Sequence, residues 1–212
     1  PTGNLTSESN FSRVITQAQA RCAYFNKSTT ASHSFREYPQ NKSRHTLSRG
    51  GSPTRWNALN EAVVDNSHAL LACGMLEWWP IFTNEADKSR QAPLSAMKPK
   101  ANDGHLLLQL AHVLKPVANF TTSVQTAGMS VASVRIQIVK LLMELASPQM
   151  KSINSDGKYI VDGSNNNQYI NVSQFDEEVL KFRALLVQHI KVRFLEEVDD
   201  EYGISMLLDP SA

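Results

Sequence analysis

The residues in this sequence that are best suited to chemistry are cations that gather in one segment beside a tryptophan. Six lysines or arginines lie between Lys27 and Arg55 against a single acid, Glu37. The cations are Lys27, Arg36, Lys42, Arg44, Arg49 and Arg55. Such side chains neutralise phosphates, and the indole of Trp56 offers a flat face on which a base can stack. The pattern predicts nucleic-acid contacts from Arg55, Trp56, Arg49, Arg44 and Lys42. A solvated loop, with Trp56 as a core residue at the first turn of a helix, explains the same residues.

Other chemistry finds little support in the sequence. It has no phosphate-binding glycine loop, no His-Glu-x-x-His zinc motif and no Gly-x-Ser-x-Gly nucleophile motif. His105 and His112 are two helical turns apart, which is too far to hold one ion comfortably, and His189 is expected on a helix face. The consecutive acids 199–201 do not face one point, so a solvated helix end is expected there. We therefore expect no catalytic residue, no metal ligand and no cofactor within this chain.

Composition bounds the class of protein. With 212 residues, 42% of them hydrophobic, the chain is long enough for one ordinary domain or for a domain with a long insertion. Its 21 basic and 20 acidic residues nearly cancel, so no overall field indicates a partner. Cys22 and Cys73 are far apart in sequence and are expected to be reduced thiols in a helical core. No apolar run is long enough for a membrane helix, and the terminal sequences suggest a fragment.

Hydrophobic spacing predicts helices over 11–25, 55–76, 105–125 and 131–146, and a last helix that starts at Ser173 and Asp176. Pro116 predicts a kink or break near Leu114. In 131–146, extra apolar residues widen the stripe, which predicts burial on most sides; they are Ile136, Val139 and Met143. The fold class is therefore mainly α, with four or five long helices and very little strand.

Polar segments separate these helices. Residues 26–54 and 84–104 have no periodicity and are predicted to be a long loop and a linker. The Trp78-Trp79-Pro80 cluster is expected to end the second helix and to open a short turn through Phe82. Within 147–173, residues 159–161 followed by Asp-Gly suggest a short hairpin strand.

A resemblance adds to this interpretation. The segment Thr54-Arg55-Trp56-Asn57 before a helix is similar to the "TRWN" segment of hAT-superfamily transposases and of the BED-zinc-finger proteins descended from them. Four further segments resemble that family in the same order, so that the likeness spans about residues 11–210. They are ARCAYFNKS at 20–28, Leu114-Lys115-Pro116-Val117 with Thr121-Thr122, the amphipathic stretch 175–194, and Met206-Leu207-Leu208-Asp209-Pro210. Ser211 departs from the family pattern, which has Arg at that place.

The resemblance implies a fold, and it implies which parts of the parent protein carry the catalytic carboxylates. In this family a large helical insertion interrupts a ribonuclease-H-like catalytic domain, in which three carboxylates hold two metal ions, Mg²⁺ or Mn²⁺. Two aspartates, with a Cys/Asp-x-x-His motif, would precede Pro1, and the third carboxylate would follow Ala212. Residues 1–56 would then be an entry helix and basic loop adjoining the ribonuclease-H-like core, and 57–212 the helical insertion domain. The family's Arg-Trp pair lies beside the active site, and its Trp holds a distorted base, so Arg55 and Trp56 inherit those candidate roles.

The resemblance also sets the functional hypotheses. The first is a fragment of a hAT-like DNA transposase that contacts DNA in the nucleus but does not cut it by itself, with homo-oligomer contacts outside this chain and no membrane. The alternative is a domesticated transposase-derived module that binds proteins, for which an exposed apolar patch on the last helix is expected. A third reading is an unrelated helical scaffold with a fully buried Trp56.

Overall fold

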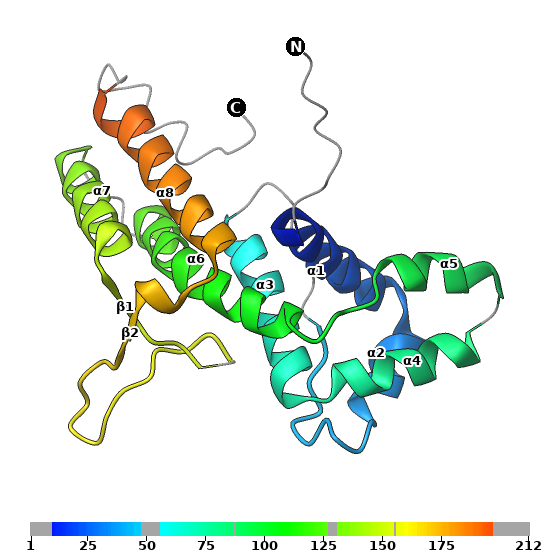
Figure 1. Cartoon of the computed structure of the whole chain (residues 1–212). Coiled ribbons are helices and arrows are strands. Elements are labelled where there is room, and N and C mark those ends of the chain that lie inside the picture. Colours follow the sequence, from blue (N-terminus) through cyan, green and yellow to red (C-terminus); the bar gives the residue numbers. More distant parts are fainter. Residues whose placement is uncertain (1–9, 48–55, 87, 127–130, 155, 197–212) are drawn as a thin grey trace, which may run out of the picture. The chain divides into compact units, whose positions relative to one another are not determined.

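The computed structural model describes residues 10–47, 56–86, 88–126, 131–154 and 156–196. The described chain is mainly helical (Figure 1), as the sequence predicts. Its α-helices are α1 (Asn10–Lys27), α2 (Thr29–Arg36), α3 (Trp56–Ala72), α4 (Met75–Glu85), α5 (Lys88–Ala96), α6 (Asp103–Thr126), α7 (Val131–Ala146) and α8 (Glu177–Lys191). The other elements are the strands β1 (Gln149–Lys151) and β2 (Tyr169–Asn171), a 3₁₀ turn η1 (Val172–Gln174) and a π-helical turn η2 (Val192–Glu196). In the described part of the chain, no helix is long and apolar enough to cross a membrane.

The chain forms two compact units. Unit 1 comprises 1–50 and 61–108, and unit 2 comprises 51–60 and 109–212. Helices α3 and α6 contribute residues to both units. The division into 1–56 and 57–212, which the family resemblance implies, stays a prediction.

The first helix of unit 1 matches its predicted span, but the predicted loop over 26–54 is wrong at its start. Helix α2 occupies Thr29–Arg36, and the Ser28 side chain caps it by accepting a hydrogen bond from the Ala31 N–H. Phe35 is fully buried, with its ring 5.1 Å from Trp78 and 5.8 Å from Phe25. Because a helix this short shows only two apolar positions, its packing partners and its cap stabilise it more than its periodicity reveals.

The break after α3 lies at Gly74 and not at the Trp78-Trp79-Pro80 cluster. Gly74 adopts the left-handed conformation with φ +70 and precedes α4. Pro80 lies inside α4, and the two tryptophans before it are buried. The Trp78 ring stacks on Phe82 with ring centroids 4.6 Å apart, so packing outweighs the local cost of the proline.

The linker predicted over 84–104 contains a helix as well. Helix α5 places Leu94 in the core with no exposed surface, and the Trp79 indole N–H donates to the Leu94 carbonyl at 3.3 Å. Met97, directly after α5, is also buried. A distant partner, Trp79, therefore supplies the order that the local sequence does not predict.

In unit 2, helix α6 continues through Pro116, so of the kink or break predicted near Leu114 the break is wrong and the kink stays a prediction. Pro116 lacks the N–H that would bond to the His112 carbonyl, which costs one backbone hydrogen bond. Leu114 and Val117 on either side of it are both buried, at 1% and 4% exposed. Burial of these neighbours keeps the helix continuous.

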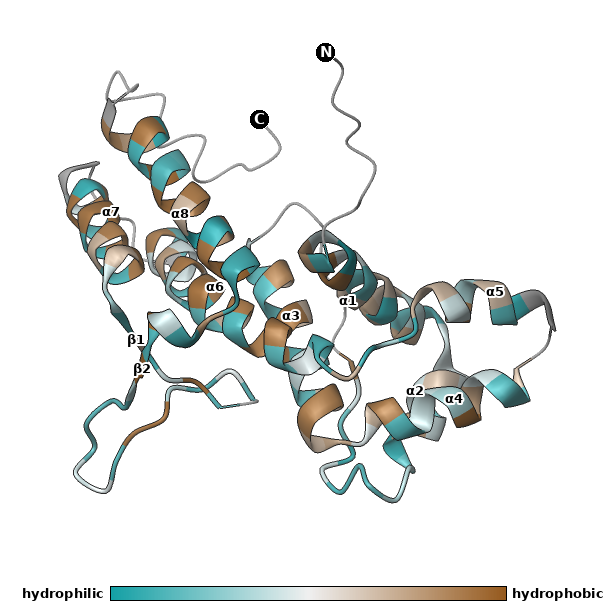
Figure 2. Cartoon of the chain, in the orientation of Figure 1, coloured by the Kyte–Doolittle hydropathy of each residue, from teal (hydrophilic) through white to brown (hydrophobic). Residues whose placement is uncertain are grey.

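Helix α7 has the predicted span, but it is not buried on most sides. Its inner face is in the core through Val134, Ile138, Leu141 and Leu145. Its other apolar residues are exposed: Ile136 by 57%, Val139 by 44% and Met143 by 69%. Figure 2 shows hydrophobic residues recurring along this helix. The exposed residues Ile136, Val139 and Met143 lie on the side of α7 opposite its core face. The apolar residues of α7 therefore form two separate faces and not one wide stripe.

The segment between α7 and α8 folds into short antiparallel pairs. β1 pairs with β2 in the register Gln149↔Asn171, Met150↔Ile170 and Lys151↔Tyr169. The predicted strand at 159–161 forms two isolated bridges, Tyr159↔Ile153 and Val161↔Asn167. Helix α8 is capped by Asp176, which accepts from the Glu178 N–H, and Ser173 lies in η1, so the start predicted at Ser173 is three residues too early.

Candidate functional site

Two of the five predicted nucleic-acid residues, Lys42 and Arg44, lie on one tight turn of unit 1. The turn follows α2, and its backbone closes through the Arg44 N–H, which donates to the Asn41 carbonyl at 2.9 Å. Arg44 has φ 53, a left-handed conformation that turns the chain sharply. Both cationic side chains are exposed. Neither forms an ion pair with another residue that the structure describes.

Asn41 holds this turn in place, and sequence reasoning missed it. The residue is 2% exposed. Its Nδ2 donates to the Phe35 carbonyl at 2.9 Å and to the His45 carbonyl at 2.7 Å, while its Oδ1 accepts from the His45 N–H at 2.8 Å and from the Ser43 hydroxyl at 3.3 Å. A buried amide with all of these bonds satisfied fixes the backbone of Lys42 and Arg44. An Asn directly before Lys42 in a polar segment is the only signal for it in the sequence.

The far side of the turn is fixed by His45 and Leu47. Leu47 is 3% exposed. The His45 Nε2 lies 3.3 Å from the Asp65 carbonyl on α3, and the His45 ring meets the His68 ring edge to face, with centroids 4.7 Å apart. The turn is therefore fastened to the helical body of unit 1 at both ends, and only its cationic tip is exposed.

Trp56 begins α3 and belongs to unit 2. It is 39% exposed, so the full burial expected of a core residue is not observed. The next residue, Asn57, donates from Nδ2 to the Thr122 hydroxyl at 3.2 Å, which joins the start of α3 to α6 within unit 2. Thr54, Arg49 and Arg55 lie outside the described residues. The structure thus groups Lys42 with Arg44 and leaves the other three as separate predictions.

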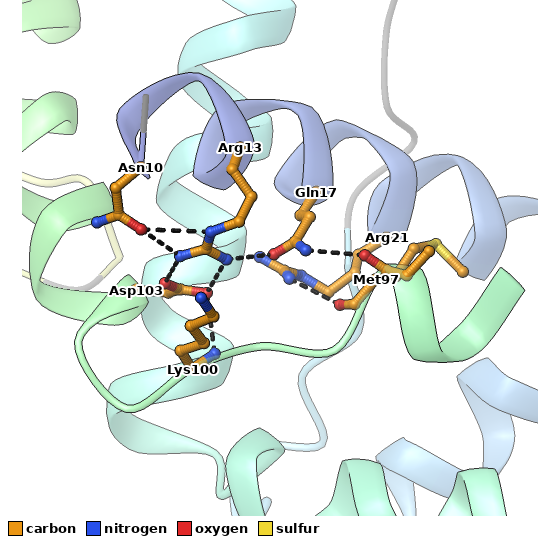
Figure 3. A network of polar contacts seen from close by, with 8 residues as sticks. Asn10, Arg13, Gln17, Arg21, Met97, Lys100 and Asp103 are labelled. Carbon is orange, nitrogen blue, oxygen red and sulfur yellow. Dashed lines mark hydrogen bonds and ion pairs between the residues drawn. The ribbon is translucent and has the colours of Figure 1, made fainter. Parts of the chain in front are cut away.

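A second polar cluster, partly buried in unit 1, was not foreseen in the sequence (Figure 3). The Arg13 guanidinium forms a forked pair with Asp103, with Nη2 to Oδ1 at 2.7 Å and Nη1 to Oδ2 at 3.3 Å. Gln17 accepts from Arg13 and donates to the Ala96 carbonyl at 2.8 Å. The Asp103 carboxylate also accepts from the Lys100 N–H at 2.9 Å. These bonds fix α1 against the segment that joins α5 to α6.

Arg21 is the most buried member of this cluster, with no exposed surface. Its Nε donates to the Asn66 Oδ1 at 2.6 Å, and its Nη1 donates to the Met97 carbonyl at 3.0 Å. Its Nη2 has no hydrogen-bond partner among the described residues. Burial lowers the pKa of Arg21 to about 10, an effect that the charge of Asp103 partly opposes. Because Arg21, Asn66 and Asp103 are buried and the cluster joins α1, α3, α6 and the segment that follows α5, its role is to hold unit 1 together.

The histidines and cysteines that the sequence analysis considered occupy surface or core positions. His105 and His189 are exposed, and His112 is buried, with its Nε2 accepting from the Ile153 N–H at 3.1 Å. Both cysteines are buried and free, as predicted, and burial raises the pKa of Cys22 to about 12. Within the described ranges, no group of three or more His, Cys, Asp or Glu side chains could hold a metal ion. Asp199, Asp200 and Glu201 lie outside those ranges.

With these positions established, the chain can be compared with known proteins. Comparisons with protein-family models, with curated proteins and with solved structures found no match for this chain.

Proposed function

We propose that this chain is a helical fragment of a hAT-like DNA transposase that contributes contacts to DNA and no catalytic carboxylate. The observation that carries the proposal is the exposed pair Lys42 and Arg44 on a turn held by the buried Asn41. This turn lies within the most cationic stretch of the sequence. Charge of one sign, exposed and fixed in place, is what binding to a phosphate backbone requires.

The rigidity of the turn matters as much as its charge. A lysine or arginine on a mobile loop must lose backbone freedom when it binds, which weakens the complex. The four hydrogen bonds of Asn41 and the burial of Leu47 remove that freedom in the unbound protein. The turn is therefore preorganised to place two cations on neighbouring phosphates.

Trp56 supports a second kind of contact. An indole that is 39% exposed at the start of a helix can stack on an unpaired base, and stacking does not depend on base identity. In the hAT family the corresponding Trp holds a distorted base, and the proposal gives Trp56 that role, with Arg55 and Arg49 as further phosphate contacts. The expected ligand is a transposon end, and the expected compartment is the nucleus.

The metal chemistry of the family is assigned to residues outside this chain. Among the described residues no cluster of acids or histidines fits a divalent ion. The proposed contribution of the chain is DNA contact and positioning.

The alternative function is a transposase-derived module that binds proteins without cutting DNA. It predicts an exposed apolar patch on the last helix, where Leu185 is 56% exposed. The larger exposed apolar row lies on α7 instead, and this row is the observation that favours the alternative.

A titration of labelled DNA with the whole chain, followed by fluorescence anisotropy, tests the proposal. Duplex and single-stranded oligonucleotides are compared between 50 and 200 mM salt. The proposal predicts binding whose log K falls linearly with log salt for both ligands. Binding that is absent at low salt, or that does not change with salt, would show that the cationic turn does not contact phosphates.

A further inference from the structure

The first two turns of α3 carry two asparagines whose side-chain oxygens lack a hydrogen-bond partner. Asn60 is 7% exposed, and its Oδ1 is buried and unpartnered within the part of the chain that the structure describes. The Oδ1 of Asn57 is buried and unpartnered in the same way. A buried acceptor without a donor costs free energy, and folded proteins keep few of them. Two such oxygens on neighbouring turns of one helix point to a donor from outside the chain.

The hydrogen bonds of α6 fix which end of the Asn57 amide is left over. The Thr122 hydroxyl donates to the Ala118 carbonyl at 3.0 Å, so its oxygen accepts from the Asn57 Nδ2 at 3.2 Å. Turning the amide over would place two acceptors against each other and lose this bond. The unpartnered atom of Asn57 is therefore an acceptor, and a donor is what the site lacks.

Trp56 shares one face of α3 with these two asparagines. Successive residues of an α-helix rotate by about 100°, so Trp56, Asn57 and Asn60 lie within about 100° of the helix circumference. Side chains of a helix lean toward its N-terminus, which directs the Asn60 amide toward the turn that carries Trp56. The Asn60 oxygen has no hydrogen bond to lose, and the terminal torsion of an Asn side chain is broad. The amide can therefore turn toward a donor that arrives at the indole, which is 39% exposed.

The chemistry of this face selects a flat, uncharged donor. Residues 56–60 contain no acid that would attract a cation. An exposed indole stacks on an aromatic ring, and an Asn oxygen accepts from an amino group at the edge of such a ring. Cytosine and adenine present this amino group, whereas uracil and thymine present a carbonyl oxygen in its place.

We propose that Trp56, Asn57 and Asn60 select unpaired bases that carry an amino group, with Asn60 as the specificity-determining residue. The inference rests on the proposed contact of Trp56 with single-stranded DNA and adds a base preference to it. A base with an amino group satisfies the two oxygens, while uracil or thymine would bring a further acceptor against them.

Fluorescence anisotropy of the whole chain with labelled oligodeoxycytidine and oligodeoxyuridine of equal length tests the proposal. The two bases have the same ring size, and the amino group of cytosine is replaced by a carbonyl oxygen in uracil. We expect the wild type to bind oligodeoxycytidine about tenfold more tightly, and Asn60→Leu to bind both oligonucleotides equally. Asn84→Leu, at an exposed position at the end of α4, is the matched control and should keep the preference. The salt dependence should be the same in all three proteins, because no charge is changed.

The other binding outcomes overturn the inference in distinguishable ways. Equal, salt-dependent binding of both oligonucleotides by the wild type would remove the base preference, leave the proposed DNA contact intact and assign the two oxygens to a donor other than a base. Binding of neither oligonucleotide at low salt would overturn the DNA contact and the base preference together.

The stability of Asn60→Leu separates a role in binding from a role in folding. Leu has a similar shape to Asn and removes an unpartnered acceptor from a nearly buried position, so we expect the Tm to rise by about 2–4 °C. A lowered Tm would show that Asn60 serves the fold. A cytosine preference that survives in Asn60→Leu would show that Asn60 does not determine specificity, and either result would contradict the inference.

Discussion

Arg21 of α1 donates from Nε to the Oδ1 of Asn66 on α3 at 2.6 Å, and neither residue has any exposed surface. Asn66 in turn donates to the Ala18 and Ala62 carbonyls and to the Cys22 Sγ. A side-chain pair enclosed in this way fixes the register of α1 on α3, because sliding either helix would leave a buried charge without its acceptor.

Changing Asn66 to Leu is therefore expected to lower the free energy of unfolding by about 2–4 kcal/mol, since Arg21 loses the acceptor of its shortest hydrogen bond in the core. Urea unfolding followed by circular dichroism measures the change. Asn84→Leu, at an exposed position at the end of α4, is the matched control and is expected to change stability by less than about 0.5 kcal/mol. Similar losses in the two variants would argue against a structural role for the pair.

Arg21→Met together with Asn66→Leu extends this test. If the two residues act as one unit, the double variant loses less stability than the sum of the two single variants, because no unpaired charge remains. An additive double-variant cycle would show that the pair contributes no coupling.

Gly74 and Gly163 differ in how much space a side chain at each position would have. A Cβ at Gly74 would lie 2.7 Å from the Gln40 Cβ on a backbone with φ +70, whereas a Cβ at Gly163 would meet no atom within 4 Å. Gly74→Ala is expected to destabilise unit 1 by at least about 1 kcal/mol, through strain and collision. Gly163→Ala is expected to be neutral within about 0.5 kcal/mol. Thermal unfolding of both variants checks the contrast, and an unaffected Gly74→Ala would show that α3 and α4 do not need the left-handed turn.

Burial of Cys22 predicts a loss of stability at alkaline pH. Its pKa is raised from 9.0 to about 12, first by desolvation, so the folded protein keeps a proton that the unfolded chain has released. The stabilisation is complete below pH 9 and decreases as the pH rises from 9 toward 12, by up to about 1.4 kcal/mol per pH unit. Urea unfolding of the wild type and of Cys22→Ala between pH 8 and 11 isolates this effect, because other titrating groups are common to both. Stability curves that stay parallel across that range would contradict the burial of a protonated thiol.

Trp56 is expected to be the accessible tryptophan, because Trp78 and Trp79 are only 2% and 1% exposed. Acrylamide quenching should therefore be strong in the wild type and weak in Trp56→Phe. If Trp56 stacks on bases, a single-stranded oligonucleotide should protect it from quenching, and Trp56→Ala should weaken binding by about 1–3 kcal/mol. Quenching that the oligonucleotide does not alter would remove Trp56 from the proposed contact.

The sequence predicts the long helices well and the short ones badly, and the reason is physical. Helices α1, α6, α7 and α8 each show several turns of apolar spacing, which local pattern alone reveals. Helices α2 and α5 depend on distant partners, Trp78 for Phe35 and Trp79 for Leu94, that no local window contains. The helix-breaking tendency of Pro80 and Pro116 is outweighed in the same way, since burial of their neighbours keeps each helix intact.

The residues of the candidate site show the same contrast between what residue types reveal and what only the packing reveals. The charge of Lys42 and Arg44 is a property of their residue types, and their exposure agrees with it. The role of Asn41 cannot be recognised from the sequence, because it depends on α2, which places the Phe35 carbonyl beside the Asn41 amide. Likewise, Arg21 looks in the sequence like a solvated residue of an amphipathic helix, and only the packing of α3 and of the segment before α6 shows that it is enclosed.

We propose that Lys42 and Arg44 contact phosphates from a fixed turn, and the salt dependence of DNA binding reports on this contact. The variant Lys42→Gln/Arg44→Asn removes both charges, and Asn tolerates the left-handed backbone at position 44. The control Arg90→Gln/Lys98→Gln removes two exposed charges elsewhere in unit 1. We expect the slope of log K against log salt for a duplex to become shallower by about 2 in the first variant and to stay unchanged in the control. Equal slopes in the wild type and both variants would contradict it.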